Sequence, residues 1–233
     1  METAILMAAG MGTRMLPITN NTPKPLVKVN GIPMIETIIN ALNYRGVEKI
    51  YIVVGYLGEQ FYYLRDQYHN IVIVENKEYS TANNISSLYA IKDVLGSANC
   101  FICEADLYIS DKTIFTSERL KSCYFGKMIM GYSDDWVFDI KNGRIVRIGK
   151  GGTDCYNMVG ISYFVKSDAQ CLKNWICTMY EQSTCRELFW DEVVNQHLDE
   201  LHLEIHDVFD GQIVEIDTVK ELCEIDDSYK SVL

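Results

Sequence analysis

The sequence lacks any long apolar run, and basic residues are scarce relative to acidic ones. No stretch approaches the roughly 20 residues that a membrane-spanning helix needs, so we expect neither a transmembrane segment nor a membrane partner. Residues 4–9 lead directly into polar loop residues, which is unlike a secretory signal. The formal net charge of −11 makes an extended nucleic-acid interface unfavourable. Any anionic ligand must therefore be bound by a few local cations and backbone amides.

The sequence also lacks the cysteine spacing of a disulfide framework. Eight cysteines in 233 residues, without a secretory signal, indicate reduced thiols and a cytoplasmic protein. Cys100 and Cys103 lie in an apolar run that predicts a strand. Their odd spacing directs the two side chains to opposite faces of such a strand. We therefore expect buried structural cysteines there, and no zinc site or disulfide.

Strand-like and helix-like segments alternate in the first half of the chain. Short apolar runs predict strands at residues 3–8, 50–54, 71–74 and 99–104. Helical periodicity and capping residues predict helices at residues 34–45, 58–68 and 84–95. This alternation is typical of right-handed crossovers and a mostly parallel α/β sheet with flanking helices. Ligands bind such sheets beyond the carboxyl ends of the strands.

A glycine-rich loop follows the first predicted strand. It is not a P-loop, since no Gly-Lys-Ser/Thr closes it, and Met15 stands where a dinucleotide fingerprint has its third glycine. Gly10 and Gly12 allow consecutive N–H groups to form a concave nest for phosphate oxygens. Arg14 adds a planar fork and Lys24, flanked by prolines, a compact positive charge. The alternative is a strand-to-turn junction with two solvated cations.

These loop residues resemble a known family signature. The runs Ala8-Ala9-Gly10-Met11-Gly12-Thr13-Arg14 and Thr22-Pro23-Lys24-Pro25-Leu26 are similar to the signature of the nucleoside-triphosphate transferases, which include sugar-nucleotide pyrophosphorylases and cytidylyltransferases. The resemblance spans essentially the whole chain, and later segments fall in the order seen in bacterial CTP:phosphocholine cytidylyltransferases. It implies a mixed, Rossmann-like α/β sheet, a nucleotide site that includes Ala8, Gly10, Gly12 and Arg14, and catalytic roles for Lys24, Arg14 and Asp106.

The second half of the chain is richer in strand signals. A hairpin is predicted at residues 138–148 around Asn142-Gly143, followed by a strand at 156–165 and helices at 167–180 and 188–198. No linker-like composition separates the halves. We therefore expect a single domain over residues 1–233, with a nucleotide-binding half over about 1–123. A small β-rich, acceptor-binding half would occupy about 124–233.

Acidic residues follow two of the predicted strands. Nucleotidyl transfer brings two polyanions together, and Mg²⁺ with hard oxygen ligands is expected at such a site. Asp106 comes directly after a buried strand, and alternation places Glu215 and Asp217 on one face. By the resemblance, Asp106 and Asp217 are the metal carboxylates and Glu215 supports them. Exposed acids at strand ends are the alternative.

Polar residues before the third predicted helix are candidates for the nucleobase. Asn83, Asn84 and Ser86 offer amide and hydroxyl groups that suit a pyrimidine edge, as residues at these positions do in relatives. For Asn84, a plain helix cap is the alternative.

An aromatic and acidic set is the candidate acceptor site. A quaternary ammonium donates no hydrogen bonds and is held by aromatic faces beside a negative charge. By the resemblance, Trp136, Trp190 and Asp191 would form that site, with Tyr132 and Phe189 nearby. Two core tryptophans with solvated acids are the alternative.

Together, these features predict a Mg²⁺-dependent cytidylyltransferase that makes CDP-choline and pyrophosphate from CTP and phosphocholine, as a monomer or homodimer. One alternative is another phosphorylated acceptor, either a sugar 1-phosphate or 2-aminoethylphosphonate. Another is a non-catalytic nucleotide-binding regulator. Loss of Lys24, Asp106 or Asp217 would have indicated a regulator, and all three residues are present.

Overall fold

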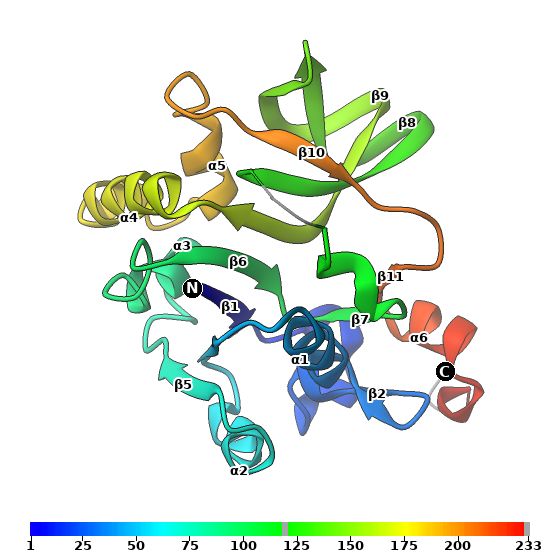
Figure 1. Ribbon diagram of the computed structural model, residues 1–233. Helices are drawn as coiled ribbons and strands as arrows, with labels where there is room; N and C mark the ends of the chain where they lie inside the picture. Colours follow the sequence, from blue (N-terminus) through cyan, green and yellow to red (C-terminus); the bar gives the residue numbers. More distant parts are fainter. Residues whose placement is uncertain (118–120, 231–233) are drawn as a thin grey trace.

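A seven-stranded mixed sheet forms the centre of the protein (Figure 1). The computed structural model describes residues 1–117 and 121–230. The strands follow the order β10-β8-β9-β6-β1-β4-β5. Their bounds are β1 Glu2–Ala8, β4 Lys49–Val54, β5 Ile71–Glu75, β6 Asn99–Glu104, β8 Cys123–Lys141, β9 Arg144–Phe164 and β10 Glu204–Asp207. Four of the six neighbouring pairs are parallel, while β9 runs antiparallel to both β6 and β8.

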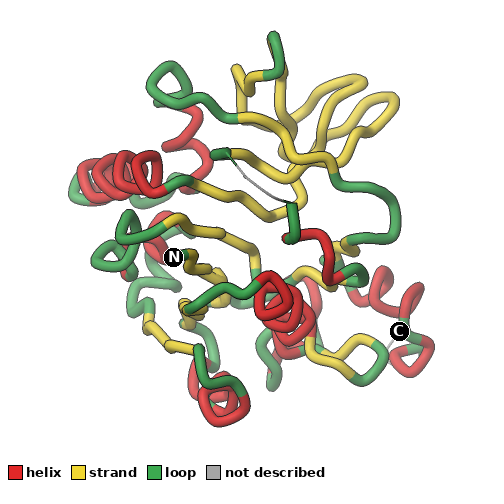
Figure 2. Tube along the Cα trace, viewed as in Figure 1, coloured by secondary structure: helices red, strands yellow, loops and turns green. Residues whose placement is uncertain are grey.

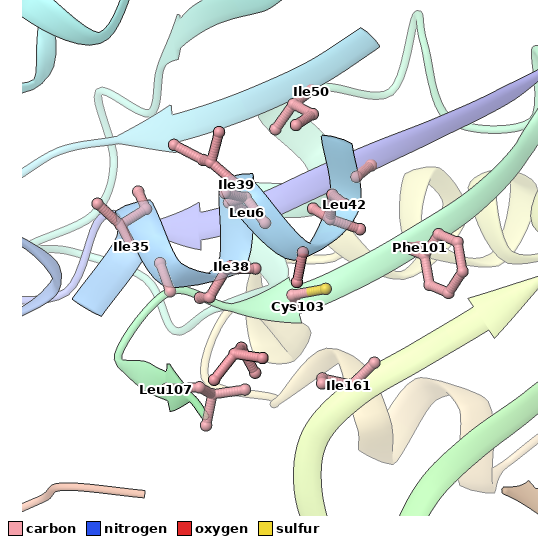
Figure 3. Close-up of a cluster of buried hydrophobic side chains, with 14 of the residues drawn as sticks. Leu6, Ile35, Ile38, Ile39, Leu42, Ile50, Phe101, Cys103, Leu107 and Ile161 are labelled. Atoms are coloured by element: carbon pink, nitrogen blue, oxygen red, sulfur yellow. The ribbon is translucent and has the colours of Figure 1, made fainter. Parts of the chain in front are cut away.

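Helices cover both faces of this sheet. They are α1 Met34–Arg45, α2 Tyr63–Gln67, α3 Ile85–Ala90, α4 Lys166–Tyr180 and α5 Trp190–Asn195, while α6 Val219–Ile225 packs away from the sheet in a smaller cluster. On β1, Leu6 packs in the core cluster under α1, whereas Ile5 packs in the cluster under α3, α4 and α5. Figure 3 shows the first cluster, with Ile35, Ile38 and Ile39 of α1 against the sheet. A strand buried on both faces reads as a continuous apolar run, which explains the sequence of β1.

Several sequence predictions are confirmed closely. Helix α1 begins and ends at the predicted residues, and Gly46 follows it with φ 89°, the left-handed conformation that favours glycine at a helix end. Cys100 and Cys103 are both buried, and they lie in the clusters on opposite faces of the sheet. The odd spacing on a strand therefore led to the right arrangement.

Two predicted helices are shorter than expected. The segment 58–68 forms a 3₁₀ turn over Gly58–Phe61 followed by the short α2. Phe61 and Leu64 are both fully buried, and a tight turn aligns residues three apart. Likewise α3 stops at Ala90, and Ile91 donates its N–H to the carbonyl of Leu88 rather than continuing the helix.

The second half contains longer strands than the sequence indicated. The predicted turn at Asn142-Gly143 is present, with φ 53° and 74°. However, the strands on either side extend to 19 and 21 residues, and their pairing includes several register shifts. These strands form the part of the sheet that extends away from β6 in Figure 2 (yellow). No helix within residues 1–117 and 121–230 combines the length and hydropathy needed to cross a bilayer.

A small third cluster joins the start of the chain to its C-terminal part. Met15 and Val27 of the N-terminal loop pack with Ile216 and Leu222, near the short antiparallel pairs β2–β3 (Lys28–Val29 with Ile32–Pro33) and β7–β11 (Leu107–Ile109 with Ile213–Glu215). Figure 1 shows α6 beside β7 and β11. This packing brings Asp217 to the glycine-rich loop.

Candidate active site

A cleft of about 250 Å³ lies where β1 and β6 end, as expected for ligand sites in open α/β sheets. Its lining comes from four parts of the chain that are far apart in the sequence. The first contains the end of β1 and the loop after it, with Met7, Ala8, Ala9, Gly10, Gly12, Thr13, Arg14, Lys24 and Pro25. The others are Asn84 and Ser87 at α3, Glu104 and Asp106 at the end of β6, and Asp217 near the C-terminus. The structure therefore gathers most of the residues that the sequence placed at the nucleotide and the metal.

The glycine-rich loop is tightly folded around Lys24. Gly12 has φ 61°, and a Cβ at this position would lie 2.9 Å from the Cβ of Lys24. The hydroxyl of Thr19 donates to the carbonyl of Gly12 at 2.9 Å, and the Tyr56 hydroxyl donates to the carbonyl of Thr19 at 2.9 Å. Glycine at position 12 is thus required by both conformation and space. At Gly10, by contrast, a Cβ would meet nothing within 4 Å.

Lys24 is buried with two carboxylates around its ammonium group. It is 6% exposed, and its Nζ lies 2.7 Å from Asp106 Oδ2 and 2.6 Å from Asp217 Oδ1. Burial disfavours the ammonium form, but the two carboxylates outweigh this effect and raise the pKa of Lys24. Lys24 is therefore a fixed positive charge at the cleft.

Arg14 forms a two-pronged ion pair with the same Asp217. Its Nη1 and Nη2 lie 2.7 and 2.8 Å from the two oxygens of Asp217, although the guanidinium itself is largely exposed. The Glu221 carboxylate in turn accepts the backbone N–H groups of Asp217 and Thr218, both at 2.8 Å, and so holds the Asp217 turn at the start of α6. Sequence reasoning missed Glu221, although Thr218 and Glu221 have the spacing of a capping box.

Carboxylates collect at the other end of the cleft. Glu104, the last residue of β6, accepts no hydrogen bond from the described residues. Burial, together with the charges of Asp106, Asp191 and Glu215, raises the pKa of Glu104 well above its usual range. Glu104 also lines a cavity of about 10 Å³ with Asp191 and Tyr124. The sequence analysis missed Glu104, although it stands two residues before Asp106.

Asp191 and Glu215 share this acidic surrounding. Asp191 is 5% exposed and accepts the Tyr124 hydroxyl at 2.9 Å. Burial raises the pKa of Asp191 to about 7, against the effect of that hydrogen bond. The protein around the Glu215 carboxyl, with the charges of Asp217 and Asp106, raises its pKa to about 7 as well. The buried Asp191 therefore resists ionisation unless a cation approaches it, whereas Glu215 is exposed at the end of β11.

The predicted base-binding residues divide into two groups. Asn84 lines the cleft, but Asn83 and Ser86 do not. The Asn83 amide donates to the carbonyl of Glu187 at 2.9 Å, and the buried Ser86 hydroxyl donates to the carbonyl of Asn83 at 2.7 Å. Ser87 lies at the cleft in place of Ser86, because α3 turns its next residue toward that side.

The two predicted acceptor tryptophans are far from equivalent. Trp190 is 4% exposed and stacks on Tyr124 in the core, with ring centroids 5.8 Å apart. Trp136 instead meets Phe189 edge-on at 5.5 Å, and both line a separate open hollow with Lys150. The structure does not bring Trp136 and Trp190 to one pocket in the described part of the chain. For Trp190, the core alternative describes its surroundings correctly.

Comparisons with known proteins identify the family. A 2-aminoethylphosphonate cytidylyltransferase from Lancefieldella rimae is 55% identical over 231 residues, which are 99% of this chain and 94% of that protein. The chain belongs to the nucleoside-triphosphate transferase family, in its cytidylyltransferase branch. The profile of the MobA-like NTP transferase domain matches residues 4–118.

A phosphocholine enzyme of Streptococcus pneumoniae matches nearly the whole length of this cytidylyltransferase, both in sequence and in structure. A choline-phosphate cytidylyltransferase from Streptococcus pneumoniae is 34% identical over 98% of both chains. The solved structure of a CTP:phosphocholine cytidylyltransferase from Streptococcus pneumoniae superposes with a TM-score of 0.89 at 32% identity, covering 98% of this chain and 99% of that one. The expected α/β fold with a mostly parallel sheet is therefore confirmed.

The cytidylyltransferase does not present a three-ligand metal cluster among its described residues. No three carboxylate, thiol or imidazole groups there lie close enough to hold one ion together. Asp106 and Asp217 nevertheless share the Lys24 ammonium, so their oxygens already surround a single cation. Two carboxylates completed by phosphate oxygens and water are a typical Mg²⁺ environment in phosphoryl-transfer sites. These two residues suit Mg²⁺, and Glu215 lies beside them, where desolvation by the surrounding protein and their charges raise its pKa to about 7.

Proposed function

We propose that this chain transfers CMP from CTP to 2-aminoethylphosphonate, giving CMP-2-aminoethylphosphonate and pyrophosphate. In this reaction a phosphonate oxygen forms a bond to the α-phosphorus of CTP. The bond from that phosphorus to the oxygen bridging it to the β-phosphate breaks, and pyrophosphate leaves. The observation that carries the proposal is the 55% identity to a 2-aminoethylphosphonate cytidylyltransferase over 99% of the chain. Phosphocholine, the acceptor predicted from the sequence, becomes the second candidate.

The cationic end of the cleft is suited to the triphosphate. The backbone at Gly10 and Gly12, the Arg14 fork and the Lys24 ammonium provide donors to phosphate oxygens along one wall. Arg14 and Lys24 would exchange their carboxylate partners for phosphates. Asp106 and Asp217 would then bind Mg²⁺, which supplies neutralisation of the charge that develops on the phosphates.

The acidic end of the cleft is suited to a primary ammonium. The 2-aminoethylphosphonate ammonium has three N–H donors, and Glu104 is a carboxylate at the cleft without a hydrogen-bond donor of its own among the described residues. Asp191 and Glu215 lie close enough to raise the pKa of Glu104, and an approaching ammonium would favour the ionised form of these acids. A trimethylammonium group would instead need open aromatic faces, whereas Trp190 is 4% exposed and lines only the cavity of about 10 Å³ that it shares with Glu104 and Asp191.

Phosphocholine is supported as a second acceptor by a phosphocholine enzyme that resembles this chain. The Streptococcus pneumoniae enzyme named above aligns over nearly the full chain in sequence and in structure. The exposed edge of Trp136 beside Phe189 would provide one aromatic wall. We keep phosphocholine as the alternative that the experiment must separate.

The test is pyrophosphate release with CTP and Mg²⁺ against a panel of acceptors. The panel contains 2-aminoethylphosphonate, phosphoethanolamine, phosphocholine and a sugar 1-phosphate. We expect the highest kcat/KM with 2-aminoethylphosphonate. A higher value with phosphocholine overturns the proposal in favour of the alternative. No pyrophosphate release with any acceptor would indicate a nucleotide-binding regulator.

A further inference from the structure

The loop at the cleft before α3 is joined by hydrogen bonds to the stretch before α5, which lines a separate hollow. The loop before α3 carries Asn83 and Asn84, and the stretch before α5 carries Arg186 and Glu187. The Asn83 backbone N–H donates to the carbonyl of Arg186 at 2.8 Å, and its side-chain amide donates to the carbonyl of Glu187 at 2.9 Å. The Asn84 side-chain carbonyl accepts the backbone N–H of Trp190 at 2.9 Å.

The Asn84 side chain accepts the backbone N–H of the first residue of α5, although Asn84 is not part of that helix. Helix α5 has only six residues, and its first N–H groups lack partners within the helix. The Glu192 carboxylate accepts the Phe189 N–H at 2.8 Å, and Asn84 accepts the next N–H, that of Trp190. A six-residue helix is not stable by itself, so these external bonds decide where it begins.

Asn84 also lines the cleft. Its amide nitrogen donates to no group in the described part of the chain. Its oxygen is engaged by Trp190, so the amide plane is fixed and the free NH₂ is the group left for a ligand. One side chain therefore touches both the cleft and the start of α5.

We propose that Asn84 is a positioning residue that couples nucleotide binding to the placement of α5 and of Asp191 on it. A nucleotide that accepts a hydrogen bond from the Asn84 NH₂ holds the amide in the orientation that binds the Trp190 N–H. Helix α5 then keeps Asp191 beside Glu104, in the small cavity that shares Glu104 with the cleft. This role of Asp191 rests on the acceptor site described under Proposed function.

The coupling must act in both directions. If the nucleotide strengthens acceptor binding through Asn84, the acceptor strengthens nucleotide binding by the same factor. The structure also offers a matched control away from the cleft. Glu78 accepts the Tyr180 hydroxyl at 2.5 Å and pairs with Arg186 at 3.1 Å, so it fastens the same stretch without lining the cleft.

Three variants separate the two functions of this side chain. Asn84→Asp keeps an oxygen for the Trp190 N–H but loses the NH₂ donors. Asn84→Ala loses both. Glu78→Gln weakens the same stretch without touching the cleft. The ligand is a CTP analogue with a methylene group between the α- and β-phosphorus, which binds but releases no pyrophosphate.

The first readout is hydrogen–deuterium exchange of residues 186–195, which requires no acceptor. Without nucleotide, we expect wild type and Asn84→Asp to exchange alike and Asn84→Ala to exchange several-fold faster. The CTP analogue should slow exchange in wild type and in Glu78→Gln, but in neither Asn84 variant. Unchanged exchange in ligand-free Asn84→Ala, or nucleotide-induced protection in Asn84→Asp, overturns the proposal.

The second readout is the KM of each substrate, measured with whichever acceptor the wild type uses best. Asn84→Asp should raise KM for CTP about tenfold, and it should also raise KM for the acceptor several-fold at saturating CTP, because the nucleotide no longer orders α5. Asn84→Ala should raise both KM values at least as much, and Glu78→Gln should leave the effect of CTP on acceptor binding unchanged. An acceptor KM that stays at the wild-type value in Asn84→Asp contradicts the coupling. Because the exchange experiment uses only the nucleotide analogue, a wrong acceptor assignment leaves its outcome interpretable.

Discussion

The two ends of the cleft differ in whether their ionisable side chains have partners. At the glycine-rich end, Lys24 and Arg14 already have carboxylate partners, Asp106 and Asp217, within 2.8 Å. At the other end, the Glu104 side chain forms no ion pair and accepts no hydrogen bond within the described residues, and burial raises its pKa although the Lys24 charge opposes this. The cations of one end are paired before substrates arrive, whereas the buried acids of the other end ionise only when a substrate brings a positive charge.

This contrast is a solution to a specific problem of an acidic protein. With a net charge of −11, the long-range field repels CTP, so binding depends on cations fixed at short range. Internal partners keep those cations ordered in the absence of ligand. A zwitterionic acceptor can then lie along the cleft with its anionic group near Lys24 and its ammonium near Glu104. Single substitutions at either end of the cleft test this contrast.

Removing the Lys24 cation from the glycine-rich end of the cleft should have the largest effect on turnover. We expect Lys24→Ala to lower turnover about 10²–10³-fold, the loss typical when one pre-positioned donor to developing charge is removed. The measurement is pyrophosphate release at saturating CTP and Mg²⁺. Lys28→Ala is the control, because Lys28 is exposed on β2 and lines no part of the cleft. Wild-type turnover in a folded Lys24→Ala protein would show that Lys24 contacts no phosphate.

Neutralising Asp191 should change how stability depends on pH. Its pKa is raised from 3.8 to about 7 by burial, so the folded state keeps a proton that the unfolded state has released. The bound proton thus stabilises the folded state relative to its stability at high pH. This stabilisation is fully present below about pH 4 and is lost as the pH rises toward 7. Asp191→Asn should therefore gain stability relative to wild type over that range, by roughly 2–4 kcal/mol at its upper end.

Urea unfolding at pH 5 and pH 8 provides the measurement. The control is Asp199→Asn, an exposed acid in the turn after α5, whose difference from wild type should be the same at both pH values. If Asp191→Asn also shows the same difference at both values, then Asp191 is ionised in the folded protein. The acidic end would then be less protected from water than its burial indicates.

Glu104→Gln tests whether the acidic end of the cleft binds the acceptor ammonium. A hydrogen bond to a charged group is worth ~1.5–3 kcal/mol, so kcat/KM for 2-aminoethylphosphonate should fall about 10- to 100-fold. KM for CTP should stay within twofold. Glu75→Gln, at the exposed end of β5, is the matched control. An unchanged acceptor kcat/KM would remove Glu104 from the acceptor site.

The contrast between the ends also explains what the sequence could predict. The glycine-rich loop, Lys24 and Asp106 follow strands with regular local patterns, and α1 ends at Gly46 for a local backbone reason. Asp217 reaches the loop through a tertiary cluster around Met15 and Ile216, so only the resemblance indicated it.

At the acidic end, the sequence indicated Asp191 and Glu215 through the resemblance but not Glu104. Glu104 and Asp191 meet at a small cavity between β6 and α5, which lie almost 90 residues apart in the sequence. Trp190 also lines this cavity, but most of its ring packs in the core against Tyr124. Local sequence patterns cannot show which of these neighbours a tertiary cavity brings together. The long, irregular β8–β9 pair likewise follows from tertiary pairing that local alternation does not reveal.

The smallest effect is expected from Trp136. Cation–π attraction is worth roughly 0.5–2 kcal/mol, and a primary ammonium held by carboxylates gains less from a ring than a trimethylammonium does. Trp136→Leu should therefore leave kcat/KM for 2-aminoethylphosphonate within about twofold of wild type, because Leu keeps the apolar contact with Phe189. For phosphocholine, kcat/KM should fall more, about three- to tenfold, so the preference for 2-aminoethylphosphonate over phosphocholine should widen. Both values are measured at saturating CTP. If the loss is instead larger for 2-aminoethylphosphonate, its ammonium lies against the Trp136 ring, and the carboxylates around Glu104 do not hold it.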